Sequence, residues 1–335
     1  MKKIIKICIL VAVIIIIASF AAFLYFFAGS APREENIIWG IDFSQMQAEN
    51  LKLDWKKIYL AIINDLGAKN IKLHNQWDWI EGKKDKYYFA DTDWQINQAE
   101  QSGVNIIYVL GMKSGRWPEC HIPAWAVNLT KQQQQDKILK YITEVVKRYK
   151  KSNSIIYWQV ENEPLFDFGE CPWYDKDFLK KEVELVKLLD NSRQIIISDS
   201  GEQSNWFEAA KISDIVGITM YRKVWAHITD EFGFNLNSFL SPVTYWRKAL
   251  LIKKIFGKKV ICIELQAEPW ASEPFYDVPL EEQAKTMSLE LFKKNVEYAK
   301  ATGLDTFYFW GVEWWYWMKT VQNQPQIWNE AKKLF

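Results

Sequence analysis

Short apolar runs alternate with longer amphipathic stretches along most of the chain. Eight runs rich in Ile, Val and aromatic residues are predicted to be strands: Ile37–Asp42, Asn70–Leu73, Asn105–Leu110, Ser154–Val160, Gln194–Ser198, Asp214–Thr219, Lys259–Ile263 and Thr306–Trp310. Helical periodicity between them predicts helices such as Gln132–Tyr149, Asp175–Leu189 and Glu281–Ala301. Strands that alternate with helices indicate a parallel sheet. Eight such units favour a closed (β/α)8 barrel over an open sheet.

Glycines mark the ends of several predicted helices. Gly67, Gly103, Gly257 and Gly303 each precede an apolar run by a few residues. Glycine at this position ends a helix in the left-handed conformation. The segments that follow the strands are long and rich in Trp, Pro and Glu, whereas those before the strands are short. In barrels of this kind the active site lies at the carboxyl ends of the strands, so the chemistry is expected there.

The first thirty residues have the pattern of a membrane segment. Lys2, Lys3 and Lys6 precede an uncharged run from Ile7 to Ala28. This run is long enough for a helix to cross the hydrocarbon core. We therefore predict an anchor over residues 1–30, a linker over 31–36 and one catalytic domain over 37–335. The basic residues are expected to stay cytoplasmic and the domain to lie outside, with cleavage and secretion as the alternative.

Composition narrows the possible partners. The chain has 42 basic and 41 acidic residues and a net charge of +1, which argues against a nucleic-acid partner. Aromatic residues make up 16% of the chain, including 18 Trp, and their flat faces suit sugar rings. His74, His121 and His227 are scattered and no metal-ligand spacing occurs, so neither a metal nor another cofactor is expected. A monomer is expected.

Carboxylates follow two of the predicted strands directly. The fourth ends in Val160-Glu161-Asn162-Glu163-Pro164, and the seventh in Ile263-Glu264-Leu265-Gln266-Ala267-Glu268. A carboxylate after an apolar run is costly in a core but can act at the mouth of a barrel. Two facing carboxyl groups can cleave a glycosidic bond, one as an acid and the other as a nucleophile. Glu161 and Glu268 are the neighbouring rivals for these roles.

Together these residues resemble the motif residues of glycoside hydrolase clan A, and in particular those of its family 5 cellulases. The resemblance rests on Asn162-Glu163-Pro164 and Glu264, with Tyr221 after the sixth strand and Trp310 at the end of the eighth. It implies that Glu163 is the acid/base, that Glu264 is the nucleophile and that Asn162 binds the sugar 2-hydroxyl. Lys72 stands where clan members commonly carry Arg; it keeps the charge but not the planar two-pronged hydrogen bonding.

Further substrate contacts are expected from His74, Trp77 and Gln266, and sugar subsites from Trp79, Trp117 and Trp270. Each of these has a packing role as its alternative. Glu163 could instead cap a helix, and Glu264 could be a structural ion-pair partner. Asn128-Leu129-Thr130 fits a glycosylation sequon, but Thr130 serves equally as a helix cap. Cys120 and Cys171, on the loops after the third and fourth strands, are predicted to form a disulfide.

The leading hypothesis is a retaining glycosidase acting on an oligo- or polysaccharide with β linkages. Transglycosylation would use the same two glutamates, with a sugar hydroxyl replacing water. A carbohydrate-binding barrel without turnover is the third possibility. It would require neither Glu163 nor Glu264.

Overall fold

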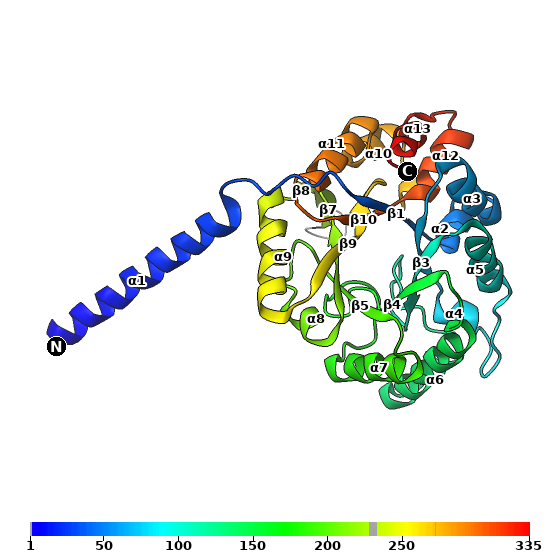
Figure 1. Ribbon diagram of the computed structural model, residues 1–335, viewed down its shortest axis with the longest axis horizontal. Coiled ribbons are helices and arrows are strands. Elements are labelled where there is room, and N and C mark those ends of the chain that lie inside the picture. Colours follow the sequence, from blue (N-terminus) through cyan, green and yellow to red (C-terminus); the bar gives the residue numbers. More distant parts are fainter. Residues whose placement is uncertain (1, 228–232, 272) are drawn as a thin grey trace.

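A computed structural model of the chain describes residues 2–227, 233–271 and 273–335. Eight parallel strands among these residues close a barrel in the order β1-β10-β9-β6-β5-β4-β3-β2, with helices around it (Figure 1). The predicted (β/α)8 fold is confirmed, and each predicted strand is present within a few residues of its expected bounds. The strands are β1 Ile38–Phe43, β2 Asn70–His74, β3 Asn105–Leu110, β4 Ile155–Val160, β5 Gln194–Asp199, β6 Ile215–Met220, β9 Lys259–Gln266 and β10 Thr306–Trp310.

Helices connect and cover the strands. Their bounds are α2 Gln45–Asn50, α3 Trp55–Ala61, α4 Trp77–Ile80, α5 Ala90–Ser102, α6 Lys131–Tyr149, α7 Lys176–Leu189, α8 Phe207–Ile212, α9 Pro242–Phe256, α10 Leu280–Thr286, α11 Leu289–Lys300, α12 Val312–Thr320 and α13 Gln326–Ala331. A π turn over Ile62–Leu66 extends α3, and 3₁₀ turns cover Phe275–Asp277 and Lys332–Leu334. Thr130 caps α6 through a reciprocal capping box with Gln133, which gives Thr130 a structural role.

Two expectations about the connections were wrong or incomplete. The predicted helix Glu281–Ala301 is divided into α10 and α11, because Met287 is extended and buried and the Ser288 side chain accepts the N–H of Leu291 to start a new helix. An antiparallel hairpin after β6, formed by β7 Lys223–His227 and β8 Gly233–Asn237, was not predicted from the sequence. The four glycines predicted to end helices all have positive φ.

The strands divide the core into two layers. Alternate residues face outward and pack under the helices, whereas a smaller inner cluster fills the barrel with Ile107, Ile196, Ile215, Ile261, Ile263 and Tyr308. Above this cluster, the inward positions at the carboxyl ends of the strands are polar. The two-residue period of a strand therefore places Asp42, Lys72 and Thr219 on the inner face of the barrel.

One strand departs from this alternation. Both neighbours of β9 shift register beside it: Ile218 pairs with Cys262 but Thr219 pairs with Glu264, and on the other side Phe307 and Phe309 pair with Cys262 and Leu265. β9 thus carries one extra residue between Cys262 and Leu265. Such a bulge redirects a side chain. It allows Ile263 to point into the barrel core and Glu264, the next residue, to point into the mouth.

The N-terminal helix α1, Lys2–Phe27, projects away from the barrel (Figure 1). Within the described residues, Lys3–Phe27 is long and apolar enough to cross a membrane, with a mean hydropathy of 3.2, and none of it is buried. This helix has the composition expected of an anchor or a signal segment.

Candidate active site

A charged network lies across the carboxyl ends of β1 and β2. The Lys72 ammonium lies 2.9 Å from Asp42 Oδ2 and 2.8 Å from Glu264 Oε1, and all three side chains are buried. His74 Nε2 lies 2.6 Å from the other oxygen of Asp42. Burial alone would lower the pKa of Lys72, but the charges of Asp42 and Glu264 outweigh it and raise the pKa above its ordinary value. Lys72 is therefore a fixed cation beneath Glu264.

Two donors hold Glu264. Lys72 Nζ donates to Oε1 at 2.8 Å, and the Tyr221 hydroxyl donates to Oε2 at 3.0 Å. Burial, followed by the charge of Glu264, raises the pKa of Tyr221 well above its ordinary value. The phenol therefore remains protonated and keeps donating. With both oxygens engaged, the carboxylate has one defined orientation at the mouth of the barrel.

Glu163 has a different environment. Its backbone has φ +43°, its N–H donates to Ser198 Oγ at 2.7 Å, and its carboxyl oxygen Oε1 accepts from Thr219 Oγ1 at 3.1 Å. Burial raises the pKa of Glu163 well above its ordinary value, and the negative charges of Glu264 and Glu119 raise it further. Burial and neighbouring negative charge therefore favour the protonated form of Glu163, as the role of a general acid requires.

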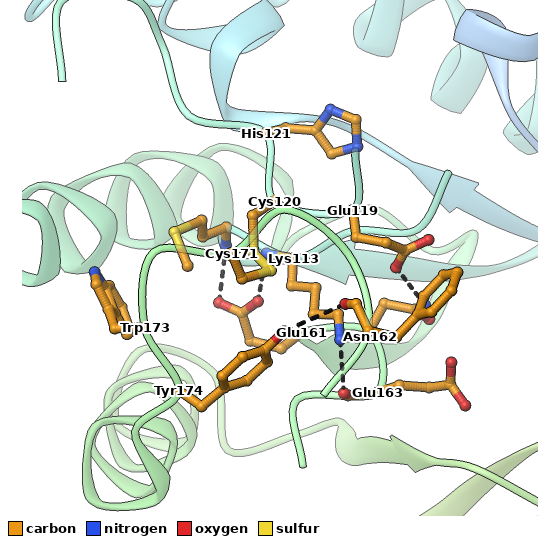
Figure 2. Close-up of a disulfide and its surroundings, with 12 residues drawn as sticks. Lys113, Glu119, Cys120, His121, Glu161, Asn162, Glu163, Cys171, Trp173 and Tyr174 are labelled. Atoms are coloured by element: carbon orange, nitrogen blue, oxygen red, sulfur yellow. Dashed lines mark hydrogen bonds between the residues drawn. A yellow bond between two sulfur atoms is a disulfide. The ribbon is translucent and has the colours of Figure 1, made fainter. Parts of the chain in front are cut away.

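The Asn162 side chain contacts Gln159, Lys72 and Glu119. Its Oδ1 accepts from Gln159 Nε2 at 3.1 Å and from Lys72 Nζ at 3.5 Å. Its Nδ2 donates to Glu119 Oε2 at 3.5 Å (Figure 2). The side chain is buried, and these contacts fix which end of the amide faces the cavity.

The two rival glutamates are engaged elsewhere. The Glu161 carboxylate accepts the backbone N–H groups of Met112 and Lys113 and points toward the disulfide, away from the Glu163 carboxyl group (Figure 2). Glu268 forms an ion pair with Arg116. Glu161 therefore braces the loop after β3, and Glu268 neutralises a buried guanidinium.

A cavity of about 1060 Å³ opens above these groups. Glu163, Glu264, Asn162 and Tyr221 line it, and its aromatic walls include Trp117, Phe166, Phe168, Trp270 and Trp310. The Trp270 ring meets Tyr221 edge-on with centroids 5.1 Å apart and lies 6.1 Å from Phe168. Arg116 covers Trp310, with 3.9 Å from its Cζ to the ring centroid. Such a wall of flat rings suits pyranose faces.

Comparison with known proteins identifies the family. Residues 34–333 match the family described as glycosyl hydrolase family 10. The chain belongs to this family. It is a glycoside hydrolase, and its family supports retaining cleavage of β-linked glycans.

Several solved structures have a similar fold. Xylanase 10B from Thermotoga petrophila RKU-1, in complex with xylobiose, is 18% identical with a TM-score of 0.53, and 82% of each chain is covered. An endo-β-1,4-xylanase of family 10 from Gloeophyllum trabeum is 17% identical with a TM-score of 0.54, covering 86% of this chain and 87% of that one. A β-galactosidase from Rahnella sp. R3 is 11% identical with a TM-score of 0.54; 84% of this chain is covered, but it spans only 52% of the β-galactosidase.

The finer family assignment made from the sequence is corrected. The resemblance to clan A is supported, but the match is to family 10 rather than to the family 5 cellulases. The motif residues alone could not separate the two families, since both are glycosidase barrels with the same expected pair of glutamates.

Three predicted substrate contacts of the family 10 barrel have structural partners instead. Trp77 is fully buried and donates to Glu81 at 2.8 Å. Gln266 Oε1 accepts the N–H groups of Arg222 and Lys223, both at 2.9 Å, and fixes the start of the hairpin. His74 is bonded to Asp42 and to the Ser114 carbonyl.

The predicted contacts therefore divide into two sets. The described residues that line the cavity do not include Trp77, Gln266, His74, Trp79 or Lys72. Lys72 still acts on the site through Glu264. Trp117, Trp270 and Trp310 line the cavity.

Several residues of the site were missed from the sequence. Glu119, Arg116 and Glu202 line the cavity, and Asp42 anchors Lys72. Asp42 carried the same signal as Glu264, a carboxylate at the end of an apolar strand. Glu119 and Arg116 lie in a loop without periodicity, so no local pattern could show that they face the cavity. No group of three or more His, Cys, Asp or Glu suited to a metal occurs in the described part of the chain.

Cys120 and Cys171 form a disulfide in the structure, with Cα atoms 5.2 Å apart and a sequence separation of 51 (Figure 2). It joins the loop that carries Glu119 to the loop after Glu163. Lys113 reinforces the same junction by donating to the carbonyls of Glu163 at 3.1 Å and Phe166 at 2.8 Å.

We expect replacement of both cysteines by serine to destabilise the protein by about 2–4 kcal/mol, because the crosslink restricts the unfolded chain. Thermal unfolding of exported protein would measure the change in Tm. The free, buried Cys262 provides a matched control as Cys262→Ser in the intact disulfide background. Two free thiols at positions 120 and 171 in unreduced wild-type protein, measured by mass spectrometry, would contradict the pairing.

Proposed function

We propose that this chain is a membrane-anchored, monomeric, retaining β-glycanase that uses Glu163 as acid/base and Glu264 as nucleophile. The observation that carries the proposal is the contrast between the two carboxyl groups in one cavity. Glu264 is fixed by a cation and a phenol, whereas burial and neighbouring negative charge keep a proton on Glu163. Two carboxyl groups with opposed environments are what double displacement requires.

In the first step Glu163 gives its proton to the glycosidic oxygen while a carboxylate oxygen of Glu264 attacks the anomeric carbon. The carbon–oxygen bond to the leaving group breaks, and a covalent glycosyl–enzyme ester forms. In the second step Glu163, now ionised, takes a proton from water, and that water attacks the anomeric carbon and releases Glu264. Two inversions at the same carbon give net retention.

Neighbouring residues support each role. Lys72 and Tyr221 hold the nucleophile and can stabilise its charge as the ester breaks. Asn162 is proposed to bind the sugar 2-hydroxyl through its amide, whose orientation is fixed by Gln159 and Lys72. Trp310 and Trp270 are proposed to form the sugar platform.

Xylan is the first substrate to test. Two of the structural neighbours are named as xylanases, and one of them holds xylobiose. The cavity volume of about 1060 Å³ leaves room for more than one sugar unit, because small-ligand pockets are typically about 300–1,000 Å³.

The proposed division of the chain is an anchor over residues 1–30, a connecting segment over 31–36 and the catalytic domain over 37–335. Retention of the anchor is supported by contacts between its last turn and the barrel, such as the bond from Thr244 Oγ1 to the Phe26 carbonyl at 2.8 Å. Basic residues before the helix favour an extracytoplasmic catalytic domain.

The proposal is tested by following products with ¹H NMR. Full-length protein is incubated with a panel of aryl β-glycosides and β-linked polysaccharides, including xylan, and the first anomer released is recorded. A retaining enzyme releases the β anomer before mutarotation. An α anomer released first would exclude double displacement, and products longer than the substrate would indicate transfer to a sugar hydroxyl. Glycan binding without hydrolysis across the panel would favour a binding barrel.

The basic limb of the pH profile of kcat/KM should depend on Glu119. Burial raises the pKa of Glu119 to about 7, so this group is mainly charged above neutrality, where its charge helps to keep Glu163 protonated. Glu119→Gln removes that charge and lowers the pKa of Glu163. We expect the basic limb of kcat/KM to move toward lower pH by up to about one unit.

Glu273→Gln is the matched control, since Glu273 also lines the cavity but has an exposed side chain. Its basic limb is expected to coincide with that of the wild type. A limb that moves to higher pH in Glu119→Gln would mean that Glu163 is not the group whose protonation limits activity.

A further inference from the structure

The anchor helix is attached directly to the barrel. Besides the bond from Thr244 Oγ1 to the Phe26 carbonyl, Arg247 Nη1 donates to the Leu24 carbonyl at 3.2 Å. The Arg247 guanidinium also lies over the Tyr25 ring, 4.7 Å from its centroid. Both Thr244 and Arg247 belong to α9, so the last turn of α1 and the first half of α9 form one packed unit.

The segment between the anchor and β1 follows the barrel surface. Arg33 forms an ion pair with Glu297 at 2.7 Å, and the Glu34 N–H donates to the Lys300 carbonyl at 3.1 Å. The chain therefore has contacts on both sides of the turn that leaves the helix. These contacts give the barrel one orientation relative to the anchor.

The contact between the anchor helix and the barrel extends to the edge of the cavity. The Phe27 ring, at the end of α1, stacks on Phe239 with centroids 6.3 Å apart and an angle of 21° between the rings. Phe239 is 82% exposed and is one of the residues that line the cavity. The edge of the cavity and the end of the anchor therefore share an aromatic contact.

The length of α1 places this contact at a bilayer surface. Its uncharged part, Ile7–Phe27, spans roughly 32 Å at 1.5 Å per residue, compared with a hydrocarbon core of about 30 Å. The last turn then lies in the interfacial region, where aromatic side chains such as Tyr25 are favoured.

The helix that receives the anchor has suitable chemistry for lipid headgroups. α9 lies on the side of the barrel from which α1 departs (Figure 1). Its C-terminal half exposes Lys253, Lys254 and Ile255, the last 54% exposed. Basic side chains beside exposed apolar ones are typical of surfaces that contact anionic lipid headgroups.

We propose that α9 seats the barrel on the bilayer, and that the cavity takes glycans attached to membrane lipids, which enter past Phe239. Cleavage of such a lipid-attached glycan rests on the proposed glycosidase function, whereas the seating of the barrel on the bilayer by α9 does not. The aromatic walls of the cavity accommodate both a sugar face and the apolar part of a lipid conjugate beside it.

The seating is tested by fluorescence quenching. Phe239→Cys and Tyr88→Cys are each made in the full chain with Cys8→Ser, labelled with a thiol fluorophore and reconstituted in phosphatidylcholine–phosphatidylglycerol vesicles. Cys262 is buried and the other two cysteines are paired, so the introduced thiol is the labelling site. Brominated lipid is expected to remove most of the emission at position 239.

Tyr88 is the matched control. It is 55% exposed and precedes α5, between β2 and β3, which lie across the barrel from β6 and β9. Its label should keep its emission. Equal quenching at the two positions, or protein that does not stay with the vesicles, would overturn the seating.

The substrate class is tested with two probes that share one sugar. One is the aryl glycoside most rapidly hydrolysed in the panel; the other carries the same sugar on a dialkylglycerol inserted in the vesicles. Thr244→Val combined with Arg247→Met removes two hydrogen bonds between α9 and the anchor. We expect it to lower the ratio of lipid-probe rate to aryl-probe rate about tenfold.

Thr143→Val combined with Lys147→Met replaces a threonine and a basic residue one turn apart on α6 in the same way, and its ratio should equal that of the wild type. An unchanged ratio in the α9 variant, or a wild-type enzyme that cleaves the aryl probe but not the lipid probe, would overturn the substrate class. If neither probe is cleaved, the proposed glycosidase function fails, and the quenching result still decides whether the barrel is seated on the bilayer.

Discussion

Replacement of Glu264 by Gln is expected to reduce hydrolysis of every substrate by about 10⁴-fold or more. A carboxamide cannot attack the anomeric carbon to form the glycosyl ester, so activated and unactivated glycosides should be affected alike. The Gln side chain is close in size to Glu, and its amide oxygen can still accept from Lys72 while its NH2 group donates to the Tyr221 hydroxyl oxygen. The loss is therefore chemical rather than steric, and steady-state rates on an aryl glycoside and on a polysaccharide measure it.

Folding needs a separate check in this variant, because Lys72 loses one of its two carboxylate partners. Lys72 remains 2.9 Å from Asp42, which leaves one ion pair intact. Circular dichroism and thermal unfolding should show a folded protein, and glycan binding should persist because the aromatic walls are unchanged. A folded Glu264→Gln variant with activity within about tenfold of the wild type would exclude Glu264 as the nucleophile.

Glu163→Ala should give a different kinetic pattern. Loss of a general acid typically costs about 10²–10⁴-fold, and this loss is expected on natural glycans, whose leaving groups need protonation. An aryl glycoside with a good leaving group needs little protonation, so its first step should survive. The second step then stalls because no base activates water. A burst of aryl product followed by slow turnover is the expected time course.

Rescue by azide distinguishes the acid/base residue from the nucleophile. A small anion can occupy the space left by the Glu163 side chain and attack the glycosyl ester without a base. We expect azide to restore turnover in Glu163→Ala and to yield a glycosyl azide of retained configuration, identified by NMR. A glycosyl azide of retained configuration from Glu264→Gly, with no such product from Glu163→Ala, would mean that the two roles are exchanged.

The barrel could be predicted from the sequence because its signals are local. Each strand is an apolar run bounded by a turn, and Gly67, Gly103, Gly257 and Gly303 end helices by a backbone preference that depends on one residue. The positions of Glu163 and Glu264 followed from the same logic. Each lies at the carboxyl end of a short apolar run: Glu264 directly follows the predicted strand Lys259–Ile263, and Glu163 lies three residues after Val160.

The remaining features depend on contacts between distant segments. The orientation of Glu264 results from a bulge that is visible only in the pairing of β9 with both neighbours. Arg116 and Glu119 reach the cavity through the path of a loop, and Gln266 does not line the cavity because the hairpin engages its amide. The division between α10 and α11 follows from the burial of Met287, which periodicity alone did not reveal.

Glu163 has a left-handed backbone conformation, so replacing this residue by glycine would abolish its catalytic role but increase the stability of the folded chain. A residue with a Cβ atom in this conformation costs roughly 1–2 kcal/mol, and glycine avoids most of that cost. The buried carboxyl group adds a further desolvation cost that glycine would remove. A lineage that needed only to hold sugars would gain stability by drifting to glycine at this position. Glutamate at residue 163 therefore makes the folded chain less stable than glycine at the same position would.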